Sequence, residues 1–230
     1  MTRVLAAHQP NYLPWAGLFH KLGRADVWVI ADDVQYTKHG LINRNRIRTL
    51  EGWQWLTVPV LSKGRGPQPI GAVEIDAAQA WRRKHWQALS WNYARAPYLK
   101  VHGPFLEEVY EREWQRLIGL NVELCLYLMR QFGIEVELRR SSALPLRQER
   151  SLRLVDMALA CGCQAYLAGG GASRQYLDLA VFERAGIEVS LCNFAAPPYP
   201  QCFPGFVPDV TALDLLLNCG PQSRKALFGD

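Results

Sequence analysis

The chain has 230 residues, which is within the size range of a single α/β domain and long enough to bury a sizeable core. Hydrophobic residues make up 49% of it, a share that excludes a disordered segment. The formal net charge of +5 suits a small anionic ligand and is too mild to favour nucleic acid as a partner. No apolar run approaches the roughly 20 residues of a membrane span, and the start of the chain turns polar too early for a secretory signal, so we expect a cytoplasmic protein.

The first elements predict a strand–helix–strand unit. Arg3–Ala7 is a short apolar run that ends at His8, and Trp15–Leu22 has the length and pattern of an amphipathic helix. Ala25–Ala31 is a second apolar run, which ends at Asp32-Asp33. Two nearly all-apolar strands around a helix are typical of a βαβ unit in a parallel sheet.

The next segment is polar and irregular. We expect a basic loop over Gln35–Arg48 and a β-rich run over Trp53–Val60. Leu61–Gly71 combines Gly, Pro and basic residues and predicts a mobile flap, since the strand-like Ala72–Ile75 follows at once.

Helical periodicity over Trp81–Tyr93 and Pro104–Gln131 predicts a mainly helical insertion across about residues 80–131. His85 is expected to be structural. Five tryptophans are expected in the core or between helices: Trp53, Trp55, Trp81, Trp86 and Trp91.

The remainder alternates between strands and helices. The predicted strands are Ile134–Leu138, Ala165–Ala168 and Ile187–Leu191, and the predicted helices are Leu152–Ala160, Tyr176–Arg184 and Val210–Cys219. We therefore predict one α/β domain over residues 1–230, with a largely parallel sheet flanked by helices.

Polar and glycine residues follow several of these strands. They are His8, Asp32-Asp33, Ser141-Ser142 and Gly169-Gly170-Gly171. In open parallel sheets, ligands bind beyond the carboxyl ends of the strands, near the point where the strand order reverses. The sequence therefore predicts a site at this edge.

His8 opens the most unusual segment, HQPNYLPW. It could act as an acid or base near neutral pH, or hydrogen-bond to a transferred group, while the helix start that follows favours an anion. The alternative is a buried turn that satisfies its own backbone.

Adjacent carboxylates at Asp32-Asp33 could hold Mg²⁺ or orient a basic side chain, or they could cap a turn. The glycines from Gly169 could let the backbone approach a ligand, or form a plain βα turn.

Basic residues are densest over residues 38–48: Lys38, Arg44, Arg46 and Arg48, interspersed with Asn43 and Asn45. Arginines two positions apart project to one side of an extended chain and could clamp a phosphate or carboxylate. A solvated basic face is the alternative.

Six cysteines are present: Cys125, Cys161, Cys163, Cys192, Cys202 and Cys219. Their spacing fits no zinc site, so reduced core thiols and a reducing compartment are expected. Cys219 could serve as a nucleophile, but no base in the sequence pairs with it.

The motifs HQPNYLPWAGLFHKL, ADDVQYTK, NRNRIR, WLTVPV, YLAGGGA and PPYPQ…FVPDVTALDLLLNCG resemble those of the WbqC-like family. The resemblance runs nearly end to end and implies a setting in bacterial surface-polysaccharide (O-antigen) or natural-product biosynthesis. Its motif positions fall on His8, Gln9, Pro10, Tyr12, Trp15, Asp33, Gln35, Asn43, Arg44, Arg46, Gly169, Tyr199, Gln201, Asp214 and Asn218. Thr211 stands where we expect serine, which keeps the hydroxyl.

The beginning of the chain also resembles Rossmann-like nucleotidyltransferases of the HIGH-signature superfamily. It departs from them because His20 lies well past His8.

We predict three catalytic residues, His8, Asp33 and Tyr12, and no metal ligands. The predicted substrate-binding residues are Gln9, Asn11, Gln35, Lys38, Asn43, Arg44, Arg46, Gly169, Gly170, Tyr199, Gln201 and Asn218.

Three functions follow from these residues. The first is a transferase that moves an acyl or aminoacyl group onto an amine, using a nucleotide-sugar, a CoA thioester or an acyl or peptidyl carrier protein. The second is a nucleotidyltransferase or ligase that forms an adenylate with ATP and Mg²⁺. The third is a non-catalytic binder of an anionic glycan or RNA, with binding that weakens steeply with salt. Aromatic helices could also form a homodimer face.

Overall fold

The computed structural model describes residues 2–170 and 177–229, so Gly171 and Tyr176 lie outside the described residues. The chain forms two compact units, each made of three segments. Unit 1 consists of Met1–Gln9, Gly17–Asp33 and Ile134–Ala195. Unit 2 consists of Pro10–Ala16, Val34–Gly133 and Ala196–Asp230.

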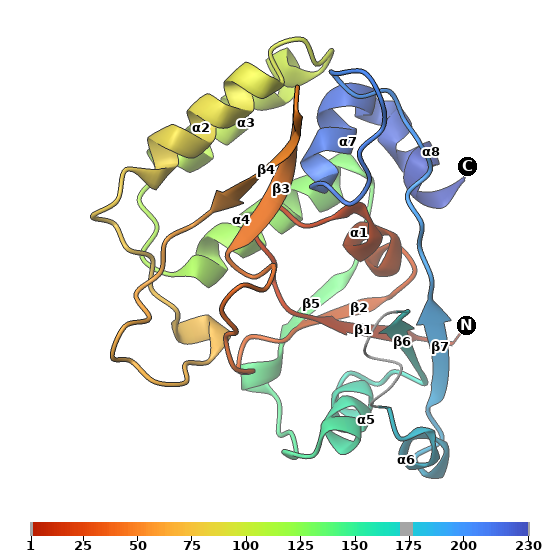
Figure 1. Cartoon of the computed structure of the whole chain (residues 1–230). Coiled ribbons are helices and arrows are strands. Elements are labelled where there is room, and N and C mark those ends of the chain that lie inside the picture. The colour runs from red at the N-terminus through yellow and green to blue at the C-terminus, as the bar shows by residue number, and fades with distance from the viewer. Residues whose placement is uncertain (1, 171–176, 230) are drawn as a thin grey trace. The chain divides into compact units, whose positions relative to one another are not determined.

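Unit 1 is built on a five-stranded sheet in which every pairing is parallel, with the order β5-β2-β1-β6-β7. The strands are β1 Val4–His8, β2 Val27–Ile30, β5 Glu137–Arg140, β6 Ala165–Gly169 and β7 Glu188–Cys192. Figure 1 shows helix α1 (Ala16–Leu22) over one face, and α5 (Arg150–Ala160) and α6 (Leu179–Arg184) over the other. The prediction of an α/β fold with a parallel sheet flanked by helices is confirmed.

The sheet forms because its central strands are apolar on both faces. All four residues of β2 are buried, as a strand covered by helices on both sides requires. On one side, Leu5 and Val29 pack with Val155 of α5 and Phe182 of α6 in a single core. The helices predicted in this unit are present, with α5 beginning two residues before the expected start and α6 beginning at Leu179.

The strand order reverses at β1, which makes the gap between β1 and β6 the topological switch point of the sheet. Strand β1 stays paired with β2 as far as His8↔Ile30. With β6 it pairs only at Val4↔Ala165 and Leu5↔Tyr166. The two strands therefore diverge before their carboxyl ends.

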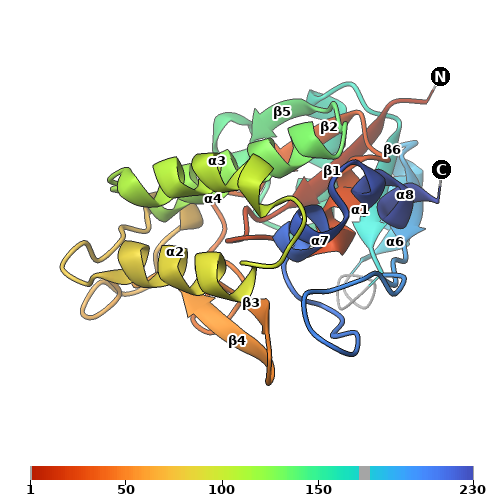
Figure 2. The same ribbon diagram turned by 90° about the horizontal axis from the view of Figure 1, so that it is seen from above.

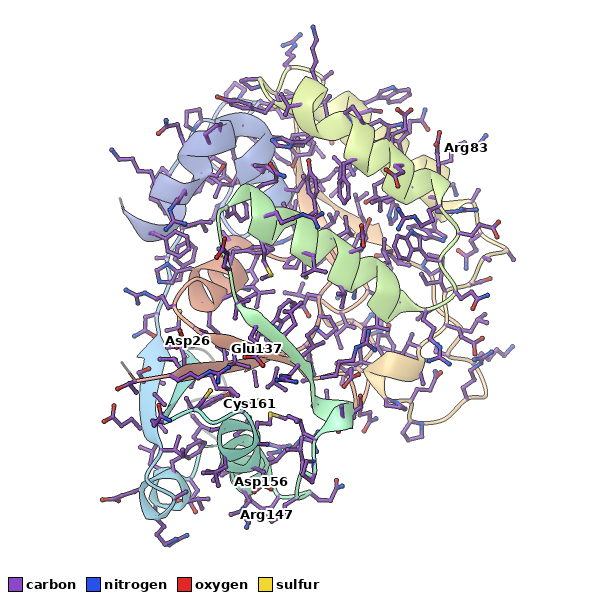
Figure 3. All side chains as sticks on the ribbon, turned by 180° about the vertical axis from the view of Figure 1, so that it is seen from behind. Asp26, Arg83, Glu137, Arg147, Asp156 and Cys161 are labelled. Carbon is purple, nitrogen blue, oxygen red and sulfur yellow. The ribbon has the colours of Figure 1, made fainter. Side chains whose placement is uncertain are left out.

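Acidic groups lie at the opposite, amino-terminal edge of the sheet. Figure 3 shows Asp26 and Glu137 close together there, and the Glu137 amide donates to the Asp26 carbonyl at 2.9 Å. Glu137 also forms an ion pair with Arg3. Sheet pairing begins at this bond, which is why β5 starts at Glu137 and not at Ile134 as predicted.

Unit 2 combines an antiparallel hairpin with helices. The hairpin is β3 Arg44–Thr49 and β4 Gly52–Thr57. The helices are α2 Trp81–Asn92, α3 Leu99–Glu111, α4 Leu117–Gln131, α7 Ala212–Cys219 and α8 Ser223–Phe228. Short 3₁₀ turns cover Ile70–Ala72 and Gly220–Gln222 in unit 2 and Ser141–Ala143 in unit 1. Figure 2 shows α2 and α3 side by side, with the hairpin next to α2.

Three predictions for the middle of the chain were wrong in part. The loop expected over Gln35–Arg48 ends in strand β3. The helix expected over Pro104–Gln131 is two helices, separated where the Trp114 indole donates to the Val109 carbonyl at 2.8 Å. Ala72–Ile75 forms no strand, because a 3₁₀ turn ends at Ala72 and the following residues make only single bridges, Glu74 to Arg116 and Ile75 to Val60.

The tryptophans that were predicted to be buried differ in their exposure to solvent. Trp81 is buried as predicted, whereas Trp53, Trp55 and Trp91 are exposed. All six cysteines are free thiols. Over the described ranges, no helix combines the length and the apolar character needed to cross a membrane.

Candidate functional site

The candidate site of unit 1 lies at the carboxyl edge of its sheet (Figure 1). The register places His8, Ile30 and Arg140 level with one another at the ends of β1, β2 and β5. Gly169 and Cys192 are level at the ends of β6 and β7. The strand-end residues predicted from the sequence are therefore brought to one edge.

The His8 ring has a defined tautomer. Its Nδ1 lies 2.7 Å from the Gln9 carbonyl oxygen, which can only accept, so Nδ1 carries the hydrogen and Nε2 of the neutral ring is unprotonated. Burial and the nearby Lys21 ammonium lower the pKa of His8 to about 4. The ring is partly exposed. His8 is therefore a neutral proton acceptor at physiological pH.

Lys21 of α1 lies beside this histidine. It is 5% exposed, and its Nζ donates to the Ala7 carbonyl at 3.0 Å. The ammonium also lies 5.9 Å from the centre of the Tyr166 ring. Burial lowers the pKa of Lys21 to about 8.

Asp32 joins the ends of β2 and β5. Its carboxylate accepts from the Ser142 amide at 2.9 Å, the Ser142 hydroxyl at 2.8 Å and the Ser141 hydroxyl at 3.1 Å. The Arg140 guanidinium lies 3.8 Å away. Both oxygens of Asp32 are thus already bonded.

Asp33 forms an ion pair with Arg153 of α5 and accepts from Ser141. Partial burial raises the pKa of Asp33, but the bonds from Arg153 and Ser141 outweigh it and leave the pKa below its ordinary value. Asp33 therefore positions Arg153, while the His8 ring is oriented by the Gln9 backbone.

Asp32 and Asp33 do not fit a Mg²⁺ ion, which needs free carboxylate oxygens. Serine and arginine groups occupy their oxygens. In residues 2–170 and 177–229, no group of three or more His, Cys, Asp or Glu side chains could hold a metal.

Glycine at position 170 is required by close packing. A Cβ there would overlap the Asn193 side chain, and the Gly170 amide donates to the Cys192 carbonyl at 2.9 Å. The close approach is thus to the neighbouring strand β7, with Gly169 one residue before it on β6.

In unit 2, basic and aromatic side chains share one face of the hairpin. Arg44 lies 4.3 Å from the Trp55 ring, and Arg46 lies 5.1 Å from the Trp53 ring and 5.9 Å from Trp55. Trp53 and Trp55 are 45% and 39% exposed. The prediction that arginines two apart share one side is confirmed on strand β3.

Tyr12 is fully buried in unit 2. Its hydroxyl lies 2.9 Å from His85 Nδ1 and 2.5 Å from the Tyr110 hydroxyl. His85 also forms a hydrogen bond with the Thr57 backbone. Burial raises the pKa of Tyr12 well above its ordinary value and lowers that of His85 to about 4. This network holds the HQPNYLPW turn in place.

Tyr199 and Gln201 converge on a buried carboxylate. Asp214 accepts from Tyr199 at 2.7 Å, from Gln201 at 3.0 Å and from Tyr93 at 2.8 Å. Burial raises the pKa of Asp214, and the hydrogen bonds oppose the shift only in part. Asn218 donates to the Asp214 carbonyl at 2.8 Å and accepts from Cys202 at 3.3 Å. These groups fix the segment before α7.

The other predicted binding residues of unit 2 divide by exposure. Asn43 is buried and donates to the Val58 carbonyl at 2.8 Å, and Asn11 is also buried. Gln35 and Lys38 are exposed. Among the predicted site residues, His8, Gln9, Asp33, Gly169 and Gly170 belong to unit 1 and the others to unit 2.

Sequence reasoning missed Lys21 and Arg153. Lys21 lies on a helix in which every residue but His20 is buried, so the signal was a cation on the apolar side of a short helix. Arg153 carried no local signal, because its partner Asp33 is 120 residues away in the chain.

A model of the WbqC-like protein family matches residues 9–226. The chain is 36% identical over 227 residues to the uncharacterised protein Rv1507c of Mycobacterium tuberculosis, covering 98% of this chain and 97% of that protein. No solved structure matches the chain.

Proposed function

The chain belongs to the WbqC-like protein family, and from this premise we propose that it is a group-transfer enzyme of bacterial surface-polysaccharide or natural-product biosynthesis. It transfers an acyl or aminoacyl group from a CoA-, carrier- or nucleotide-linked donor to an amine. The observation that supports this reaction best is the 2.7 Å contact between His8 Nδ1 and the Gln9 carbonyl oxygen. It leaves Nε2 available as a general base.

In this reaction His8 Nε2 takes a proton from the amine as the new C–N bond forms. The tetrahedral intermediate then breaks its bond to the thiolate or phosphate leaving group, which receives that proton from the imidazolium. The products are an amide and a free thiol or phosphate. With a pKa of about 4 the resting ring is a weak base, and a bound anionic substrate would raise that pKa.

Charged groups have supporting roles in the proposal. Asp33 holds Arg153 at the end of β2, where its guanidinium can stabilise negative charge on the substrate. Tyr12 contributes indirectly by fixing the turn after His8.

The test is His8→Ala in an assay with acyl-CoA donors and amino-sugar nucleotide acceptors, read by mass spectrometry. Loss of general base catalysis should lower kcat by about 10²- to 10⁴-fold. His20→Ala, which removes an imidazole from the same segment, is the control and should retain most activity. Turnover that survives in a folded His8→Ala protein would contradict the proposal.

A second candidate is a nucleotidyltransferase or ligase that forms an adenylate. It is favoured by the strand order β5-β2-β1-β6-β7, since doubly wound sheets of this order bind nucleotides at their switch point. Because Asp32 and Asp33 do not fit Mg²⁺, no step is assigned to that ion. Pyrophosphate release from ATP with a panel of carboxylic acids would separate this reaction from acyl transfer.

A further inference from the structure

Lys21 is a cation that is almost fully buried in unit 1. Its Nζ donates to the Ala7 carbonyl at 3.0 Å and lies over the face of the Tyr166 ring. In the part of the chain that the structure describes, no Asp or Glu forms an ion pair with it. Burial of an uncompensated charge is strongly unfavourable, and a bound anion would supply the missing counter-charge.

The position of the ammonium is that of a ligand site. Ala7 lies on β1 and Tyr166 on β6, the two strands that diverge after Leu5↔Tyr166. Divergence leaves the Ala7 carbonyl without a β6 partner, and Lys21 donates to it. One ammonium hydrogen is used there, and two remain for another acceptor.

The groups that face Lys21 do not neutralise it. His8 on β1 is uncharged at neutral pH, because burial lowers its pKa to about 4. Burial raises the pKa of Cys192 on β7, so that thiol is uncharged as well. Tyr166 on β6 has a pKa raised to about 12 by burial. Of these four groups, Lys21 alone is charged at neutral pH.

We propose that Lys21 binds a phosphoryl group of the substrate at the switch point between β1 and β6, next to His8. That the bound ligand is a substrate rests on the proposed function. A lysine ammonium binds phosphate as a compact point charge, and doubly wound sheets hold phosphates at this place. The site adds a substrate contact on α1 to those predicted from the sequence.

The test compares pyrophosphate binding to wild type, Lys21→Met and Arg24→Met by isothermal titration calorimetry at pH 7. Arg24 is exposed three residues further along the chain, so its variant removes the same charge from the surface. We expect at least tenfold weaker binding for Lys21→Met and less than a twofold change for Arg24→Met. Equal weakening in both variants, unchanged binding in Lys21→Met, or no binding to wild type would overturn the site. Acetate that binds as tightly as pyrophosphate would overturn the phosphoryl assignment.

A second measurement needs only the wild-type protein. Sulfate keeps its charge between pH 6 and 10, so its affinity should fall about tenfold per pH unit above pH 8 as Lys21 loses its proton. A pH-independent affinity would contradict the site.

These measurements read binding without turnover. Pyrophosphate binding that depends on Lys21, together with unchanged turnover in His8→Ala, would support this site and contradict the proposed transferase. Pyrophosphate binding that does not depend on Lys21, together with lost turnover in His8→Ala, would contradict this site and support the proposed transferase.

Discussion

At the scale of single residues, the charge on Lys21 affects the pKa of His8. Burial is the larger cause of the low His8 pKa, and the Lys21 ammonium is the second. Lys21→Met removes that positive charge, so the pKa of His8 should rise from about 4 part of the way toward 6.5. An NMR titration of the imidazole protons measures it. Arg24→Met should leave the value unchanged, and a His8 pKa that ignores Lys21 would contradict the coupling.

Asp214 makes a second residue-scale prediction, on stability. Asp214→Ala leaves the buried hydroxyl of Tyr93 and the Tyr199–Gln201 pair without their acceptor. Each unsatisfied buried group costs about 1–3 kcal/mol, so we expect a loss of about 2–4 kcal/mol in the free energy of unfolding. Urea denaturation followed by circular dichroism measures it. Glu51→Ala, at an exposed turn of the same unit, should change stability by less than about 0.5 kcal/mol.

How far the sequence predicts a residue's role depends on where its partners lie in the chain. The place of His8 at a strand end follows from its own segment, as the register bears out. The hydrogen bonds of Tyr199 and Gln201 to the buried Asp214 could not be predicted, because they depend on how α7 and Tyr93 pack in the folded chain. Lys21 was missed for a related reason: a lysine on a short helix normally reaches solvent, and here the sheet carbonyl of Ala7 holds it inside.

At the scale of elements, the turn after α7 depends on Gly220. This residue has a φ of +51°, and a Cβ there would overlap the Tyr98 ring. Gly220→Ala should lower stability by about 2–4 kcal/mol, from left-handed strain and overpacking together. Gly205 has a φ of +75° but open space around it. Gly205→Ala should therefore lose only the stability that backbone strain costs. Thermal unfolding of the two variants measures the difference. Equal losses of stability in Gly220→Ala and Gly205→Ala would contradict the overlap with the Tyr98 ring.

Elements were predictable where burial is uniform. The run that became β2 is apolar on both faces, and only a covered strand explains such a pattern. Strand β3 was predicted as a loop because its charges are typical of solvent-exposed coil. In the structure, Arg44 and Arg46 stack on tryptophans of β4, and Asn45 on the opposite face is buried. Those stabilising partners lie on another strand.

At the scale of the whole molecule, two histidines predict acid sensitivity. His8 and His85 both have a pKa lowered to about 4, chiefly by burial. The unfolded chain therefore binds more protons than the folded chain between about pH 6.5 and 4, and stability falls as the pH falls through this window. The loss approaches 1.4 kcal/mol per pH unit for each imidazole that stays neutral in the folded protein.

Urea denaturation at pH 7, 5.5 and 4.5 measures this dependence. His85→Gln should reduce the slope, because it removes one of the two imidazoles that bind a proton in the unfolded chain and stay neutral in the folded protein. A slope that is the same in wild type and variant would contradict the assignment to His85.

The α/β class was predictable for the whole chain from its alternation of apolar strands and helices. The grouping of the segments into two units could not be predicted. Composition does not indicate that residues 17–33 and 134–195 belong to one unit while residues 34–133 belong to the other. That division is set by strand order and long-range packing, which leave no mark on any single segment. The single domain predicted over 1–230 remains a prediction about how these two units act.

The register between β2 and β5 has a consequence for protein synthesis. Val27 pairs with Glu137, so the strand that completes this side of the sheet is translated about 110 residues after its neighbour. At roughly 5–20 residues per second, β1 and β2 wait about 5–20 s on the ribosome for β5, and longer for α5 and α6, which cover one of their apolar faces. We expect nascent chains stalled before residue 137 to be sensitive to protease across these two strands, and to depend on a chaperone until α5 and α6 emerge.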